Sequence, residues 1–287
     1  MTGTKIDGLE VAQAVKERVK KAVEELKAQG INPCLATVLV GDNQASTTYV
    51  KNKQKACAEV GIATKDHHIP ASISQKELND LVDSLNNDRS VHGILVQLPL
   101  PDQINEFEAI SRISPIKDVD GLTPYNAGLL AMGKAALKAC TPSGIMELFD
   151  YYKIELAGKN VVMINRSNLI GKPLYHLLLE KNATVTTCHS KTKNLAEFTK
   201  LADIIITAVG DRTKFTLKQD MIKNDAVVID VAITRHDGKL AGDCDYEDII
   251  KKASFATPVP GGVGPMTVAM LLKNTVTAAS LSKGLGK

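Results

Sequence analysis

Short apolar runs alternate with amphipathic stretches along this chain, and that alternation restricts the fold more than any other feature of the sequence. In the first half, strands are predicted at CLATVLVG, at residues 62–69 and at GILVQL, with helical patterns between them. Strands that alternate with helices pair in parallel, because each connection must cross over before the next strand begins. We therefore expect an α/β fold with a parallel sheet in this half.

The helices of the first half are marked by their periodicity and by their ends. Apolar residues recur every four positions over 9–27 and predict a long helix that stops at Gly30 (Val11, Val15, Val19 and Val23). A second helix is predicted over 46–60. Ser74 and Glu77 have the capping-box spacing that starts a third.

The pattern restarts near the middle of the chain. A helix-rich stretch is expected over 126–138, and from CTPSG a new helix leads to the strand NVVMI. TVTTC, DIIITAVG and AVVIDVAI predict further strands at the spacing of a doubly wound sheet. We expect two domains, an N-terminal α/β catalytic domain over 1–139 plus 267–287 and a Rossmann-like nucleotide-binding domain over 140–266. The last helix, predicted to begin near Met266, returns to the first domain, a placement to which the resemblance described below contributes.

The composition narrows the class of protein. With 287 residues, 44% of them hydrophobic, the chain is long enough for each of two domains to bury its own core. Aromatic residues make up 4% and Trp is absent, so neither a stacking surface for nucleic-acid bases nor a membrane-interface belt is expected. The net charge is +3, with basic and acidic residues interspersed as on a solvated surface.

The absence of targeting signals and the spacing of the cysteines indicate the compartment in which the protein is expected. The start MTGTKIDGLE lacks the basic and apolar stretches of a signal peptide, and no segment approaches the ~18 uninterrupted apolar residues of a membrane span. A soluble, cytoplasmic protein is therefore expected. The five cysteines lie far apart without a CxxC pair, which argues against a zinc knuckle and a disulfide framework. We expect most of them to be reduced and buried.

A junction of strand, turn and helix in the second half predicts a phosphate-binding site. NVVMI runs directly into the turn at 165–172, and Pro173 suits the first turn of the following helix. Such junctions bind phosphate because unpaired N–H groups and the positive end of the helix dipole point at the anion. The usual GxGxxG is absent, so the motif alone is weak evidence.

The end of the next strand strengthens this prediction and selects the cofactor. An NAD enzyme would place an acid there, on the ribose hydroxyl, whereas this chain has HSKTK at 189–193. Arg166 can hold a 2′-phosphate bidentately, with Ser167 and Ser190 as neutral donors, and this combination predicts NADP. The alternative, that Arg166 and Lys191 are solvated surface charges, stays open.

Polar side chains in the first half predict a second site. Tyr49 and Lys53 are four residues apart on a predicted helix and project from the same face. Gln97 ends an otherwise apolar strand, and the turn Asp118-Val119-Asp120-Gly121 follows Pro115. Ligands of open α/β sheets bind at the ends of parallel strands, so these groups would suit a polar heterocycle. The alternative for Tyr49 and Lys53 is a solvent-exposed pair.

One further cluster has metal-ligand chemistry, at His236, Asp237, Asp243, Cys244 and Asp245. We expect no metal there, because His236-Asp237-Gly238-Lys239 fits a hairpin turn with Asp-Gly at its centre. His67 and His68 are adjacent and would face opposite sides of a strand, so they make a poor ligand pair.

Taken together, these segments resemble the bifunctional methylenetetrahydrofolate dehydrogenase/methenyltetrahydrofolate cyclohydrolase family over nearly the entire chain. The matching blocks are VGDNQASTTYVKNKQKAC at 40–57, GILVQLPLP at 93–101, PIKDVDGLTPYNAG at 115–128, CTPSGIMELF at 140–149, NRSNLIGKPLYHLLL, ATVTTCHSKT and TPVPGGVGPMT at 257–267.

The resemblance implies that 5,10-methylenetetrahydrofolate gives a hydride to NADP and that the methenyl product is hydrolysed to 10-formyltetrahydrofolate in the same cleft. It implies that Lys53 is the key catalytic group and that Gln97 hydrogen-bonds it. Tyr49 would pack over the folate, and Asp120 would hold the pterin ring. The PGGVG turn, with Pro260, Gly261 and Gly262, would line the substrate cleft. The resemblance also implies a cytoplasmic homodimer of one-carbon metabolism that serves purine biosynthesis.

The resemblance assigns the NADP site to Asn165, Arg166, Ser167, Ser190, Thr192, Ala232 and Thr234. Three of these depart from the family pattern. Asn165 stands where Gly commonly precedes Arg-Ser, and Ala232 and Thr234 give DVAIT where DVGIN is more usual. An added Cβ at Ala232 would crowd a dinucleotide that comes close to the backbone, so the NADP/NAD ratio stays open.

Two other functions are compatible with parts of this pattern. A different two-domain NADP dehydrogenase could act on a small hydroxy or amino acid, but the folate blocks disfavour it. A non-catalytic NADP-binding module would be expected to lack Lys53, Gln97 and Asp120, and all three are present.

Overall fold

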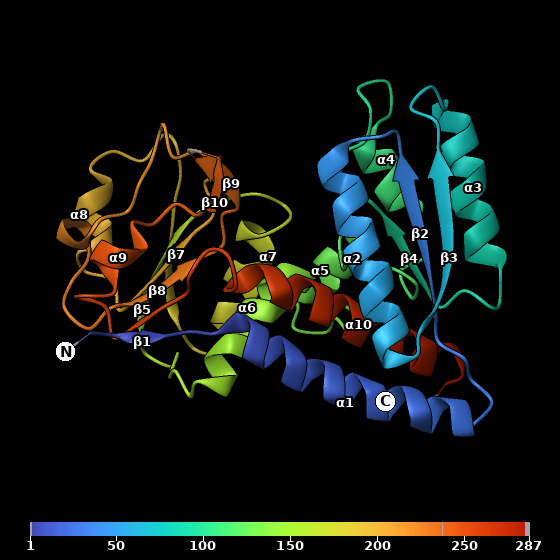
Figure 1. Ribbon diagram of the computed structural model, residues 1–287, viewed down its shortest axis with the longest axis horizontal. Coiled ribbons are helices and arrows are strands. Elements are labelled where there is room, and N and C mark those ends of the chain that lie inside the picture. Colours follow the sequence, from blue (N-terminus) through green and yellow to red (C-terminus); the bar gives the residue numbers. More distant parts are fainter. Residues whose placement is uncertain (1, 237, 285–287) are drawn as a thin grey trace. The chain divides into compact units, whose positions relative to one another are not determined.

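The computed structural model describes residues 2–236 and 238–284 and divides into two compact α/β units (Figure 1). The three-stranded unit comprises Ala14–Cys140 and the chain from Val268 onward. The six-stranded unit comprises the chain up to Gln13 and Thr141–Thr267. The predicted organisation is confirmed: both units are α/β, and the C-terminal helix belongs mainly with the first.

The three-stranded unit has a parallel sheet in the order β3-β2-β4. Its elements are most of α1 (Gly8–Ala28), β2 (Cys34–Val40), α2 (Gln44–Val60), β3 (Ala63–Ile69), α3 (Gln75–Asn87), β4 (Gly93–Val96), α4 (Glu106–Ser111), α5 (Pro124–Ala131) and most of α10 (Val263–Ser282). β2 is central and buried along its whole length, as expected for a strand covered on both faces. One face of the sheet packs against α3 and α4 through Ala36, Val38, Ile94, Leu78, Val82 and Ile110.

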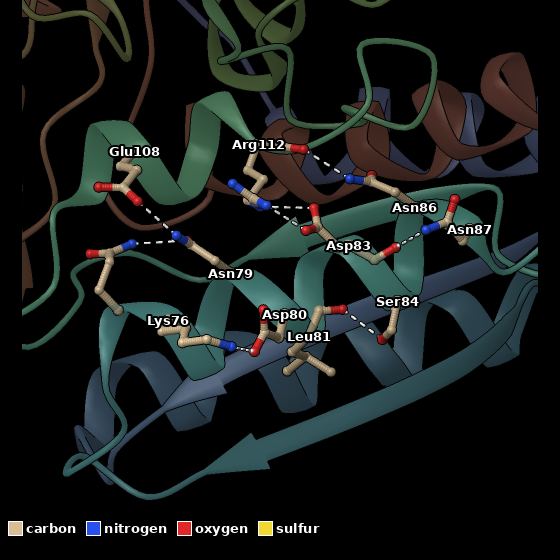
Figure 2. Close-up of polar contacts among 11 residues, drawn as sticks. Lys76, Asn79, Asp80, Leu81, Asp83, Ser84, Asn86, Asn87, Glu108 and Arg112 are labelled. Carbon is tan, nitrogen blue, oxygen red and sulfur yellow. Dashed lines mark hydrogen bonds and ion pairs between the residues drawn. The ribbon is translucent and has the colours of Figure 1, made fainter.

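Polar contacts fix α4 on α3 (Figure 2). Arg112 donates from Nε and Nη2 to the two oxygens of Asp83 at 2.8 and 2.5 Å. Asn79 donates to Glu108 at 2.6 Å, and Asn86 donates to the Arg112 carbonyl at 2.8 Å. The predicted capping box at the start of α3, between Ser74 and Glu77, is present and satisfies two N–H groups of the first turn.

The six-stranded unit has a parallel sheet in the order β1-β11-β8-β7-β5-β6. Its elements are β1 (Thr4–Lys5), α6 (Cys140–Tyr151), β5 (Asn160–Ile164), α7 (Gly171–Glu180), β6 (Thr184–Cys188), α8 (Leu195–Thr199), β7 (Ile204–Thr207), η1 (Gln219–Met221), β8 (Val227–Asp230), the hairpin β9 (Thr234–His236) and β10 (Lys239–Ala241), α9 (Tyr246–Ile249) and β11 (Phe255–Ala256). The chain goes from β5 out to β6 and then resumes at β7 on the other side of β5. The order of strands therefore reverses at β5, and nucleotides bind at the carboxyl ends of strands beside such a switch.

Three features differ from the sequence predictions. The helix expected over 126–138 ends at Ala131, because Gly133 adopts φ +66° and the N–H of Lys134 closes back on the Leu129 carbonyl at 2.8 Å. α10 begins at Val263 instead of near Met266, since Pro265 is accommodated within its first turn.

The start of the chain is the third difference. β1 pairs with β11 in the six-stranded sheet, and this groups the first residues with the second half of the chain. The sequence-based boundaries placed residues 1–139 together, and as limits of functional domains they stay a prediction.

The state of the cysteines and the length of the helices can be compared directly with the sequence predictions. All five cysteines are buried and unpaired, as expected. Within residues 2–236 and 238–284, no helix is both long and apolar enough to cross a bilayer.

Candidate active site

Lys53 and Gln97 meet at the carboxyl end of the three-stranded sheet. Gln97 follows β4 directly, and its backbone N–H donates to the Val38 carbonyl at 2.9 Å. Lys53 lies in α2, is only 7% exposed, and donates from Nζ to Gln97 Oε1 at 3.0 Å. Gln97 Nε2 donates to the Leu98 carbonyl at 2.6 Å, and this second bond turns the amide oxygen toward the amine. A buried amine is thus held by a neutral acceptor.

The turn at 118–121 uses its two carboxylates differently. Asp118 is buried and accepts the N–H groups of Leu122 and Thr123 at 3.1 and 2.8 Å and the Asn126 amide at 2.9 Å. Its role is to build the turn. Asp120 is only partly buried.

The charge on Asp120 depends on its surroundings. Burial raises the pKa of its carboxyl, while the positive charge of Lys53 and the thiol of Cys140 act the other way. Asp120 therefore belongs to the same electrostatic environment as Lys53, which makes it the carboxylate of the turn that can serve a ligand.

The backbone around Asp120 is fixed by the C-terminal helix. Gly121 adopts φ +68°, and a Cβ there would come within 2.4 Å of the Lys138 carbonyl carbon, so only glycine fits. Asn274 of α10 is buried and donates from Nδ2 to the carbonyls of Val119 and Lys138, each at 2.8 Å. These contacts tie the last helix to the Asp120 turn.

Tyr49 lies one helical turn before Lys53 on α2. Its side chain is 44% exposed, in contrast to the buried Lys53. The spacing places both residues on one face of α2. The partial exposure of Tyr49 leaves part of its side chain available to a ligand or to solvent.

The turn after β5 is built by Asn165. Its Oδ1 accepts the N–H groups of Ser167 and Gly171 at 2.8 and 3.0 Å, and its Nδ2 donates to the Ala208 carbonyl at 2.7 Å. Ser167 Oγ in turn accepts the Ile170 N–H at 3.1 Å. The side chain predicted to touch the cofactor is therefore engaged in shaping the turn, and Arg166 projects from it exposed.

Arg166 and Ser190 follow neighbouring strands. Ile164 pairs with Cys188 at the ends of β5 and β6, so the residues just beyond both strands lie at the same sheet edge. Thr192 shapes the turn after β6, where its Oγ1 accepts the His189 N–H at 2.9 Å. Ser190 and Lys191 are exposed, and no acidic residue lies in this turn. The donors present match a phosphate group.

The remaining predicted residues lie at the far part of the same edge. Ala232 is 5% exposed and its N–H donates to Asp230 Oδ1 at 3.1 Å, while Thr234 is half-buried at the start of β9. Beyond β11, Gly261 adopts φ +97° and Pro260 is exposed. Gly262 is buried, and a Cβ there would lie 2.5 Å from the Pro258 carbonyl oxygen, so no larger residue fits.

The residues at 236–245 that were considered as metal ligands form a hairpin and the buried segment after it. Asp243 is fully buried, and burial raises the pKa of the Cys244 thiol well above its ordinary value, so that the thiol stays protonated. β9 and β10 pair as the predicted hairpin, although Asp237 itself lies outside the described residues. Within the described part of the chain, no three His, Cys, Asp or Glu side chains gather where they could hold a metal ion.

Sequence reasoning missed several residues that build these sites. Asp118, Asn126 and Asn274 shape the Asp120 turn, and Asp230 with Asp243 shapes the nucleotide edge. The signal available was a polar residue next to a glycine or at the end of an apolar strand. That signal does not separate a ligand contact from a buried backbone contact.

Comparisons with known proteins match both halves of the chain to one family. Residues 6–120 match the family model described as the catalytic domain of tetrahydrofolate dehydrogenase/cyclohydrolase, and residues 139–283 match the NAD(P)-binding domain of that family. The bifunctional protein FolD of Nitrosopumilus maritimus (strain SCM1) is 76% identical over 287 residues, which covers 100% of both chains.

Solved structures show the same architecture. The bifunctional enzyme FolD, a methylenetetrahydrofolate dehydrogenase/cyclohydrolase from Campylobacter jejuni, superposes with a TM-score of 0.94 at 48% identity over 97% of this chain and 99% of that one. The FolD dehydrogenase-cyclohydrolase of Trypanosoma brucei, solved with NADP cofactor and an inhibitor, gives a TM-score of 0.93 at 38% identity over 99% of both chains. The chain described here therefore belongs to the tetrahydrofolate dehydrogenase/cyclohydrolase family.

Proposed function

We propose that this chain oxidises 5,10-methylenetetrahydrofolate to 5,10-methenyltetrahydrofolate with NADP and then hydrolyses the methenyl product to 10-formyltetrahydrofolate. The observation that carries the proposal is the buried Lys53 amine, held 3.0 Å from Gln97 Oε1 at the carboxyl end of β4. Ligands of open α/β sheets bind at this edge. Matches to both family domains support two activities in one chain.

Lys53 is proposed to manage protons during hydrolysis. The attacking water must lose a proton and the departing ring nitrogen must gain one, and a single amine can serve both steps in turn. The neutral Gln97 amide orients the amine without adding charge. Gln97 is thus an orienting partner of Lys53.

Asp120 and Tyr49 are proposed to hold the folate. A carboxylate can accept paired N–H bonds from the edge of a pterin ring, and Asp120 is the partly exposed acid of its turn. Tyr49, a residue that is 44% exposed, offers an aromatic side chain one turn from Lys53. Pro260, Gly261 and Gly262 stay predicted substrate contacts.

NADP, when bound, accepts the hydride from the folate. The residues at the ends of β5 and β6 fit its 2′-phosphate, because the exposed Arg166 and Ser190 follow adjacent strands and the turn at 189–193 contains no acid. Ser167 is a further predicted donor. Asn165, Thr192 and Ala232 are engaged in backbone contacts, so we assign their contribution to the shape of the site. Thr234 stays a predicted contact.

The wider setting is also part of the proposal. We propose a folate-binding catalytic domain over 1–139 plus 267–287 and an NADP-binding domain over 140–266. The chain is proposed to act as a homodimer in the cytoplasm and to supply 10-formyl groups for purine biosynthesis. Support for these points comes from the resemblance alone.

An absorbance assay tests the proposed function. The purified chain is mixed with 5,10-methylenetetrahydrofolate and either NADP or NAD, and formation and decay of methenyltetrahydrofolate are followed. We expect the methenyl species to appear faster with NADP and then to decay faster than in a control without protein. A chain that forms no methenyl species with either nucleotide would contradict the proposal.

A further inference from the structure

Two buried carboxylates lie at the nucleotide edge of the six-stranded sheet without touching that edge's surface. Asp230 ends β8 and is 2% exposed, and Asp243 follows β10 and is 0% exposed. Neither belongs to the predicted folate or NADP contacts. A buried carboxylate is costly unless hydrogen bonds satisfy its oxygens, so their partners indicate what they do.

Asp243 holds the loop that follows β7. Its Oδ2 accepts the Thr207 hydroxyl and the Val209 N–H, both at 2.6 Å, and its Oδ1 accepts the Gly210 N–H at 2.9 Å. The same loop is held from its other side by Asn165, which donates to the Ala208 carbonyl. Four consecutive residues at the carboxyl end of β7 are therefore fixed by two side chains.

Asp230 positions Asp243. Its Oδ1 accepts the Asp243 N–H at 3.1 Å and its Oδ2 accepts the Cys244 N–H at 2.7 Å. Gly242 allows this approach, because a Cβ there would lie 2.1 Å from Asp230 Oδ2. Oδ1 also accepts the Ala232 N–H at 3.1 Å, so one carboxylate ties the end of β8 to the segment that carries Asp243.

The position of residues 207–210 in the sheet relates them to the nucleotide site. β7 pairs with β5 in register up to Ile164 and Thr207, and the strand order reverses at β5. A dinucleotide on this sheet lies across the carboxyl ends of these two strands. Residues 207–210 therefore form one wall of the nucleotide site, although none of their side chains carries a charge.

We propose that Asp243, oriented by Asp230, is a positioning residue for NADP that acts through the backbone of residues 207–210. The inference rests on the proposed function for the location of NADP. Asp243 does not contact the cofactor, since its carboxylate is fully buried and both oxygens face N–H or O–H donors.

The test compares Asp243→Asn with Asp245→Asn in the full chain. The amide that replaces the Asp243 carboxylate can accept at only one of its two terminal atoms, so its Nδ2 would face a donor and part of the loop would lose its anchor. Asp245 is two residues away, and its side chain makes no capping bond to α9, so the same substitution there is a matched control. The measurements are the Kd for NADP, the KM for NADP, the melting temperature, and hydrolysis of methenyltetrahydrofolate without nucleotide.

We expect Asp243→Asn to raise the Kd for NADP by ~10-fold or more, while nucleotide-independent hydrolysis stays near wild type and Asp245→Asn binds normally. Thr207→Val removes one of the three bonds and leaves the carboxylate, so it should raise the Kd for NADP by a smaller factor. This variant tests the inference even if Asp243→Asn does not fold.

Wild-type affinity for NADP in Asp243→Asn would overturn the inference. So would a parallel fall of hydrolysis and NADP binding, which would show a general loss of folding. A wild-type chain that binds no NADP would instead contradict the proposed function.

Discussion

Replacing Asn165 by Ala distinguishes a residue that contacts the cofactor from a residue that builds its site. The side chain makes three hydrogen bonds, to the N–H groups of Ser167 and Gly171 and to the Ala208 carbonyl. Each is worth about 0.5–1.5 kcal/mol net, and because the site is half-buried, water replaces part of what is lost. We therefore expect the free energy of unfolding of the six-stranded unit to fall by about 1–3 kcal/mol.

Urea unfolding followed by circular dichroism, with and without NADP, measures this effect. Asn168→Ala is a matched control, since Asn168 is exposed in the same turn, and its effect should stay within about 0.5 kcal/mol. NADP affinity should fall together with stability in Asn165→Ala, because the turn is no longer preformed. A variant with wild-type stability and lost NADP affinity would refute this reasoning and make Asn165 a direct cofactor contact.

The roles of Arg166, Asp120 and Asp230 can each be tested by one substitution. Arg166→Ala should weaken NADP binding by roughly 10- to 150-fold and leave NAD binding nearly unchanged, as measured by titration; equal losses would assign Arg166 another role. Asp120→Ala should raise the KM for folate and leave the Kd for NADP intact, and an unchanged folate KM would contradict its pterin-holding role. Burial raises the pKa of Asp230 from 3.8 to about 6, so the folded state binds its proton more tightly than the unfolded chain. This group's contribution to stability is full below pH ~4 and falls by about 3 kcal/mol as pH rises to ~6, and an Asp230→Asn chain should lack that slope in urea unfolding between these pH values.

The helices and strands were largely predictable because their signals are local. The valines of α1, the capping box of α3 and the apolar strands of both sheets lie where periodicity predicted them. The end of α5 at Ala131 was not predictable, because the residues that follow also suit a helix. The positive φ of Gly133 ends the helix there. Similarly, residues 4–5 carry no local sign that they add to the edge of a distant sheet.

The sites were predictable in residue type and less so in role. Gln97 at the end of β4 and Lys53 on α2 converge, which the sequence could suggest only through the general rule for parallel strands. Asp243 was weighed as a metal ligand and instead binds backbone N–H groups. Asn165 shapes its turn, and its assignment to the cofactor stays a prediction. The sequence shows an Asp both for a buried carboxylate and for one that binds a ligand. Only the hydrogen-bond donors around it in the structure distinguish the two.

The central claim is that Lys53 carries the hydrolytic step, and Lys53→Met tests it most directly. Methionine keeps the length and apolar stem of a side chain that is only 7% exposed but removes the amine that donates to Gln97. Lys51→Met is the matched control, because Lys51 is exposed on the same helix. The rate of methenyltetrahydrofolate hydrolysis above the uncatalysed background is measured for both variants. We expect Lys53→Met to lose about 10²- to 10⁴-fold and Lys51→Met to match wild type, whereas a wild-type rate in Lys53→Met would place the general base elsewhere.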